Sequence, residues 1–231
     1  MPTALPAPFR PALFTFLRQL ARHNERAWFE QHKARYESEV RGPALAFIEA
    51  MGPRLAGFAP QFRALPRKSG GSLMRVYRDT RFSRDRTPYK TNVGIHFRHA
   101  LGRDVHAPGY YLHLEPGRCF VAAGIWRPAP PALRRIRDFL ADNPGGWRAA
   151  LAAAPFAGQF VLDGESLTRA PRGYPADHPL LDELKRKDFI AVRDLPDRAA
   201  QQADFVDRVA ADFAAATPLM RYLCAALEVP F

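Results

Sequence analysis

GYYLHLEPGRCFVAAGIW, residues 109–126, holds two runs of strand-forming residues on either side of a turn signal. The first run alternates apolar and polar side chains, and the second is rich in small and β-branched residues. Between them Pro116 presets its own φ, and Gly117 is free to adopt a positive φ, as a tight turn requires. The stretch therefore predicts a β-hairpin.

Two segments that precede this hairpin also have the pattern of strands, SLMRVYR at 72–78 and TNVGIHFRH at 91–99. We expect the four strands to form one antiparallel sheet, within a sheet core that spans 72–126. Helical periodicity dominates the parts of the chain on either side, 9–66 and 130–231.

Because the sequence has no repeat and no linker, the prediction is one α+β domain over residues 1–231. Its central antiparallel sheet is expected to be covered on one face by the N- and C-terminal helices. Near the N-terminus, Asn24 should cap a helix that Gly42 and Pro43 end. In the C-terminal part, QFVLDG predicts a short strand, and Asp177 is expected to cap a helix.

The chain has a formal net charge of +11, and that charge is unevenly distributed. Residues 67–104 contain ten basic and three acidic side chains, whereas residues 105–231 contain fifteen of each. Arginine supplies 29 of the 34 basic residues, a bias that a GC-rich genome also produces. The high pI is therefore weak evidence for nucleic-acid binding, but the local surplus marks the middle segment.

Two cysteines, Cys119 and Cys224, are too few for a disulfide framework or a zinc site, and their apolar surroundings predict buried reduced thiols. The N-terminus lacks the features of a secretory signal. No apolar run approaches the roughly 20 residues that a membrane-spanning helix needs. We therefore expect a cytoplasmic protein that does not bind membranes.

Strand alternation brings a set of polar side chains to one face of the predicted sheet. With the apolar residues facing the helices, the other face carries Arg75, Tyr77, His96, Arg98, Tyr111, His113 and Glu115. Water alone explains polar residues on many antiparallel sheets. The mixture of aromatic, His and Glu side chains favours a functional surface instead, with His113 and Glu115 as a candidate catalytic acid/base pair.

The segment YRDTRFSRDRTPYKTN, residues 77–92, contains five cationic side chains and two aspartates. Guanidinium and ammonium groups suit phosphate or carboxylate oxygens, so anion binding by this segment is one prediction. The alternative is that its arginines only pair with Asp79 and Asp85 as internal struts. The candidate anion-binding residues of the whole chain are Arg75, Tyr77, Arg78, Arg81, Lys90, Tyr111, Arg169 and Lys187.

Four motifs, NERAWFEQHKARY, RVYRDTRFSRDRTPYKTNVGIHF, GYYLHLEPG and LTRAPRGYPADHPLLDELKRKDF, extend over nearly the whole chain. Together they resemble a bacterial family of conserved hypothetical proteins, the domain of unknown function 2461. The resemblance implies a single-domain cytoplasmic protein with no assigned activity, and it brings no catalytic residues. It suggests a family signature through Arg78, Asp79, Arg81, Lys90, Tyr111, His113, Glu115, Arg169, Asp177, His178 and Lys187. Thr168 departs from the lysine that is more typical there.

The sequence contains no P-loop, no dinucleotide-binding glycine motif and no zinc-protease or hydrolase motif. His96, His113 and Glu115 are residue types that bind divalent metals, but the surplus of nearby arginine disfavours a cation. No metal and no cofactor is therefore predicted.

Three functions fit these observations. The first is an enzyme or binding protein for a phosphorylated small molecule or nucleotide, with the basic segment on the phosphate. The second is a nucleic-acid-binding module in which Tyr77, Tyr111 and Trp126 stack on bases. The third is a structural or protein-interaction domain. A concave site favours the first and a flat basic stripe the second, while enzymatic activity and oligomeric state stay open.

Overall fold

The predicted hairpin is present in the computed structural model, which describes residues 7–81, 84–102 and 106–231. Its turn closes with a hydrogen bond from the Arg118 amide to the Glu115 carbonyl at 2.9 Å, and Gly117 has a φ of +80°. The antiparallel sheet has the strand order β1-β2-β3-β5-β4. The strands are β1 (Val93–Arg98), β2 (Gly109–Leu114), β3 (Cys119–Ile125), β4 (Val161–Asp163) and β5 (Phe189–Leu195).

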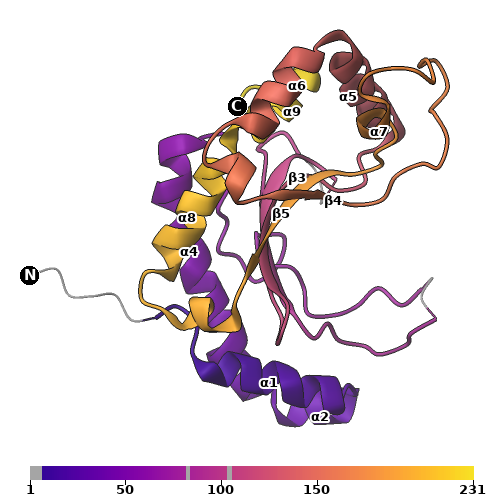
Figure 1. Cartoon of the computed structure of the whole chain (residues 1–231). Helices are drawn as coiled ribbons and strands as arrows, with labels where there is room; N and C mark the ends of the chain where they lie inside the picture. Colours follow the sequence, from indigo (N-terminus) through magenta and orange to yellow (C-terminus); the bar gives the residue numbers. More distant parts are fainter. Residues whose placement is uncertain (1–6, 82–83, 103–105) are drawn as a thin grey trace, which may run out of the picture.

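Helices from both ends of the chain cover one face of this sheet, which confirms the predicted α+β class. Figure 1 shows α4 and α8 side by side against the sheet, although they come from opposite ends of the sequence. The helices are α1 (Pro11–Arg22), α2 (Arg26–Gln31), α3 (Lys33–Arg35), α4 (Gly42–Phe58), α5 (Pro130–Asp142), α6 (Pro144–Ala152), α7 (Leu181–Leu184), α8 (Phe205–Ala215) and α9 (Thr217–Ala226).

The hydrophobic core lies between the sheet and these helices. Every second residue of the central strands points into it, and Phe97, Tyr110 and Val121 are fully buried. The Phe213 ring of α8 packs against Phe97 and Tyr110, with ring centroids 5.8 and 5.0 Å apart. Both cysteines are buried and reduced, as predicted. The alternation leaves the opposite sheet face for other side chains.

The predicted helix break at Gly42 and Pro43 is wrong. The chain remains helical from α3 through a π-helical stretch, Tyr36–Arg41, into α4. Proline cannot donate the usual backbone hydrogen bond, and its ring crowds the preceding turn. The wider π-helical turn directly before Pro43 accommodates that ring, so the helix continues.

Asn24 does not cap a helix, contrary to the prediction. Its side-chain nitrogen donates to the Tyr89 carbonyl at 2.9 Å, and its side-chain oxygen accepts from the Tyr89 amide at 3.0 Å. The side-chain amide of Asn24 thus makes the two hydrogen bonds with the Tyr89 backbone that a neighbouring strand would otherwise make. The helix that follows, α2, begins without any side-chain cap.

Residues 72–78 do not form the regular strand that the sequence predicts. The Met74 amide donates to the Gly94 carbonyl of β1 at 2.9 Å. Further along, the Arg78 amide donates to the Pro88 carbonyl at 2.9 Å. Because the segment changes partner after a few residues, it forms only isolated bridges in place of a ladder.

In the C-terminal part, the predicted short strand is present as β4, and β5 was not predicted. FIAVRDL follows a charged helical pattern without a turn signal, which hides its strand character in the sequence. The sheet therefore extends beyond the predicted core of 72–126. Asp177 caps no helix, because α7 begins only at Leu181 and has no side-chain cap.

Candidate functional site

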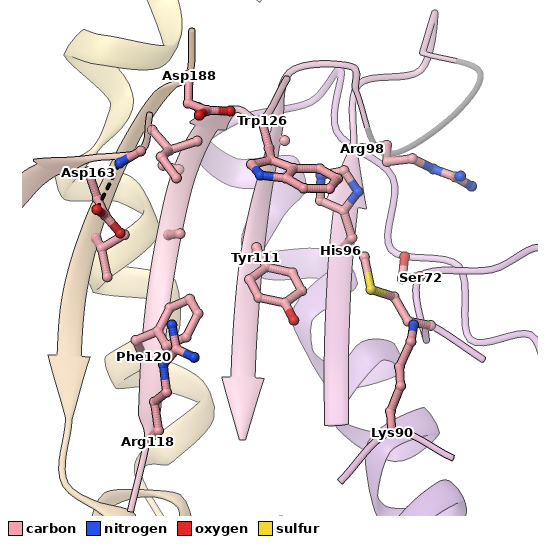
Figure 2. Close-up of a pocket in the computed structure, with 18 of the residues that line it drawn as sticks. Ser72, Lys90, His96, Arg98, Tyr111, Arg118, Phe120, Trp126, Asp163 and Asp188 are labelled. Atoms are coloured by element: carbon pink, nitrogen blue, oxygen red, sulfur yellow. Dashed lines mark hydrogen bonds between the residues drawn. The ribbon is translucent and has the colours of Figure 1, made fainter. Parts of the chain in front are cut away.

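A cavity of about 980 Å³ lies on the sheet face opposite the helices. Its floor is formed by Tyr111 of β2 and by side chains of β3 and β5, including Phe120 and Val192. One wall is the irregular segment before β1, and the other is the β4 end of the sheet. Figure 2 shows Lys90 and Arg98 on the first side and Asp163 and Asp188 on the second.

Two glycines in the strands leave room for the rings of Tyr111 and His96 in the cavity. A Cβ atom at Gly94 would lie 2.7 Å from the Tyr111 hydroxyl, and one at Gly109 would lie 2.1 Å from His96 Nε2. His96 and Tyr111 are cross-strand partners in the β1–β2 register. Each ring therefore lies over a glycine of the neighbouring strand, where any larger residue would collide with it.

Behind Tyr111 is a chain of three polar groups, Tyr111, His113 and Glu115. The Tyr111 hydroxyl is 2.9 Å from His113 Nδ1, and His113 Nε2 is 3.3 Å from Glu115 Oε2. Thr91 donates to the other Glu115 oxygen at 2.9 Å. The His113 ring stacks on Phe120, with centroids 4.6 Å apart and an interplanar angle of 10°.

Burial, the largest effect, lowers the pKa of His113, although the Glu115 carboxylate beside it acts in the opposite direction. A neutral imidazole carries one proton, and the carboxylate can only accept, so Nε2–H donates to Glu115. Nδ1 then accepts from the Tyr111 hydroxyl. Burial raises the pKa of that hydroxyl. Tyr111 lines the cavity, whereas His113 and Glu115 do not. The predicted acid/base pair therefore meets the cavity only through the Tyr111 hydroxyl.

Four basic side chains line the cavity without forming an ion pair with any carboxylate of the described residues: Arg75, Lys90, Arg98 and Arg118. Burial lowers the pKa of Lys90, and the charge of Arg75 adds to the effect. The Arg118 guanidinium lies over the Phe120 ring, 5.7 Å from its centroid. These four cations thus gather on the cavity without an ion pair to a described carboxylate. Asp79 lines the same cavity, and its pKa is lowered by its hydrogen bonds to Arg81 and also by the charge of Arg75.

The carboxylates of the cavity are all engaged with donors of the chain. Asp188 is buried and accepts from the amides of Arg127 at 2.7 Å and Glu165 at 2.8 Å. Asp163 accepts from the next backbone amide. The Glu165 carboxylate pairs with Arg127 at 2.9 Å and with Lys187 at 3.2 Å. Only Glu165 has cationic partners here, whereas Asp163 and Asp188 are held by backbone amides alone.

The hydrogen bond that the Arg127 amide donates to Asp188 also holds Arg127 in a left-handed conformation, with a φ of +46°. Such a φ is uncommon for a residue with a side chain and persists only when its surroundings enforce it. Trp126, the preceding residue, is 46% exposed at the rim of the cavity. His106 stacks on it, with centroids 5.5 Å apart. This bend thus places a large aromatic side chain at the opening.

The structure brings together some of the predicted site residues. Arg75, Lys90 and Tyr111 line the cavity, and His113 and Glu115 lie directly behind it. The sequence patterns did not indicate that the cavity is also lined by Arg118, Phe120, Asp188, Ile190 and Val192. The strand glycines at 94 and 109 were the available signal for side chains lying flat on this face.

Other predicted residues lie elsewhere. Arg78 forms an ion pair with Asp85, and Arg81 pairs with Asp79 at 2.7 Å, as the strut alternative predicts. Arg169 is exposed in the loop before α7 and does not line the cavity, nor does Lys187.

The placement of Tyr77 on the same face as Tyr111 is wrong. Tyr77 is 47% exposed and packs beside Phe29 and Tyr89, with ring centroids 6.4 and 5.3 Å away. It lines a separate hollow with Asn24. The cause is the change of partner after residue 76, which takes this part of the chain away from β1.

Within the described residues, no three His, Cys, Asp or Glu side chains are arranged to hold a metal ion. A helix long and apolar enough to cross a bilayer is likewise absent from residues 7–81, 84–102 and 106–231.

The fold and the cavity define an α+β domain with a pocket on the open face of its sheet, lined among the described residues by four basic and four acidic side chains. Residues 12–222 match the model of a family described as conserved hypothetical protein (DUF2461), and the chain belongs to that family. No curated protein and no solved structure matches the chain.

Proposed function

We propose that the sheet cavity binds a phosphorylated small molecule, such as a nucleotide. The observation that carries this proposal is the gathering of Arg75, Lys90, Arg98 and Arg118 on one cavity without a carboxylate partner in the described part of the chain. Phosphate oxygens are the acceptors that guanidinium and ammonium donors bind best. A bound phosphate would therefore balance the charge that the chain leaves open.

The apolar part of the cavity suits the uncharged portion of such a ligand. Phe120, Ile190 and Val192 form an apolar floor, and Trp126 adds an exposed aromatic surface at the rim. The volume of about 980 Å³ is within the range of roughly 300 to 1,000 Å³ usual for small-molecule sites. In a ligand with a planar group and a phosphate, the planar group would contact the apolar floor and the phosphate would contact the basic side chains.

The concave shape supports this function over the binding of a nucleic-acid strand. A strand needs cations along an extended surface, each neutralising a separate phosphate. In the sequence segment with the largest positive surplus, Arg78 and Arg81 pair with aspartates. Arg75, Lys90, Arg98 and Arg118, in contrast, converge on one cavity.

The test is thermal unfolding with millimolar inorganic phosphate or a nucleoside monophosphate. We expect both to raise the Tm of the parent protein, since a ligand at a hundredfold its Kd stabilises the native state by about 2.7 kcal/mol. The double variant Arg75→Ala/Lys90→Ala should lose that increment. The matched control is Arg18→Ala/Arg22→Ala, which removes two exposed charges from α1.

Equal increments in the two double variants would show that the cavity is not the anion site. Titration with single-stranded DNA at two salt concentrations tests the alternative. Tight binding whose log–log slope is about −0.7 per phosphate contact, without competition by the nucleotide, would support a nucleic-acid-binding module instead.

A further inference from the structure

We infer that Lys90 forms a Schiff base with the carbonyl group of an anionic aldehyde or ketone held in the sheet cavity. This inference rests on the proposed anion binding and adds a covalent step to it. It identifies the ligand as a molecule with both a phosphate and a carbonyl group.

The surroundings of Lys90 differ from those of the other four lysines in the sequence. Three of those four form ion pairs with carboxylates at 3.2 to 3.3 Å. Lys68 is exposed in the loop after α4. Lys90 is partly buried and lines the cavity, and no described carboxylate pairs with it. Figure 2 shows its side chain running along the cavity wall toward Ser72.

This environment favours the reactive form of the amine. Burial lowers the pKa of Lys90, and the nearby positive charge of Arg75 acts in the same direction. An amine attacks a carbonyl carbon only in its neutral form, and desolvation beside another cation is a known way to increase that form. An ion pair with a carboxylate would raise the pKa of a lysine, and Lys33, Lys185 and Lys187 each have such a pair.

The cavity also contains the groups that imine formation requires. The Lys90 nitrogen attacks the carbonyl carbon, a C–N bond forms, and the carbonyl oxygen takes up a proton to give a carbinolamine. The C–O bond then breaks, and the two amine hydrogens leave with the oxygen as one water molecule. The Tyr111 hydroxyl lines this cavity and, with His113 and Glu115 behind it, can exchange a proton with that oxygen.

The arginines of the cavity decide which carbonyl compounds react. Arg75 and Arg118 line the same cavity as Lys90 and provide donors for a phosphate group. A carbonyl compound without an anionic group would lack this anchor and its effective concentration near the amine would be lower. The expected ligands are therefore phosphorylated aldehydes or ketones.

Pyridoxal 5′-phosphate is a suitable probe because it carries both groups. After incubation, sodium borohydride reduces any imine to a stable secondary amine, and peptide mapping by mass spectrometry reports each lysine separately. We expect labelling of Lys90 well before Lys68 and protection of Lys90 by inorganic phosphate. Pyridoxal without the phosphate forms an internal hemiacetal and labels every lysine more slowly, so the comparison uses the ratio of Lys90 to Lys68 labelling. That ratio should fall about tenfold, the effect of losing one charge-assisted hydrogen bond.

Two matched variants complete the test. Lys90→Arg keeps the positive charge but forms no imine, so it should lose the fast labelling, whereas Lys68→Arg should not. Equal labelling of all lysines, or an unchanged ratio of Lys90 to Lys68 labelling with pyridoxal, would overturn the inference. If phosphate raises the Tm but Lys90 is not labelled, the proposed anion binding stands and the Schiff base does not. If phosphate does not raise the Tm and Lys90 is not labelled, both proposals are contradicted. If Lys90→Arg does not fold, the peptide map of the parent protein decides alone.

Discussion

At the scale of single residues, the site depends on side chains that lie against one another on the open face of the sheet. The rings of His96 and Tyr111 occupy the space above two glycines, and His113 stacks on Phe120. Tyr111, His113 and Glu115 form a chain of hydrogen bonds that ends at the cavity. This packing keeps His113 away from water, which has a consequence for the pH dependence of stability.

Burial lowers the pKa of His113 below its ordinary value of 6.5, so the native state binds a proton there less readily than the unfolded state. The free energy of unfolding should therefore fall as the pH drops through about 6.5. We expect His113→Gln to lose less stability than the parent between about pH 7.5 and about pH 5.5. Urea denaturation at a series of pH values measures this, and parallel curves for the two proteins would contradict it.

At the scale of elements, irregular segments take the place of regular strands beside β1. The Met74 amide bonds to β1, and the side chain of Asn24 bonds to both backbone groups of Tyr89. Lys90, the next residue, is thereby held at the cavity. The N-terminal helices thus hold the cavity wall through the side-chain amide of Asn24 and through Phe29, whose ring stacks on Tyr89 with centroids 4.1 Å apart.

Asn24→Ala should destabilise the protein by about 1 to 3 kcal/mol, because it leaves the amide of the buried Tyr89 without its partner. Asn24→Asp should also destabilise it, since a carboxylate cannot donate to the Tyr89 carbonyl. A helix N-cap would respond differently, because Asp caps a helix as well as Asn does. Denaturant unfolding compares the three proteins, and a neutral Asn24→Asp variant would restore the capping interpretation.

At the scale of the whole molecule, the two ends of the chain are joined by one core. The Phe9 ring packs near Phe205, with centroids 6.0 Å apart, and Phe62 packs near Phe231 at 5.7 Å. His99 Nε2 lies 2.7 Å from the Pro230 carbonyl. Figure 1 shows that α4 and α8, which come from opposite ends of the chain, also pack together behind the sheet. Within residues 7–81, 84–102 and 106–231, neither end has a separate core of its own.

We therefore expect the whole chain to unfold in one cooperative transition. The calorimetric and van't Hoff enthalpies should agree, and the far-UV and near-UV circular dichroism signals should change at the same temperature. Two transitions, with the helical signal lost separately from the aromatic signal, would show that the N- and C-terminal parts are independent units.

Several features followed from the sequence alone, because they depend on neighbours along the chain. The hairpin turn at 115–118, the alternation of β1 and β2 and the helical character of the segments on either side of the sheet core were all predicted. The same alternation correctly placed Tyr111, His113 and Glu115 on one face. These predictions needed only the twofold period of a strand or the helical period.

The tertiary structure alone decided which cations face the cavity. Arg78 and Lys90 belong to one basic segment, yet one pairs with Asp85 and the other lines the cavity. The sequence also could not place β5 beside β3, or Asn24 beside Tyr89. Contacts between residues far apart along the chain depend on how the layers pack, and local periodicity carries no information about that packing.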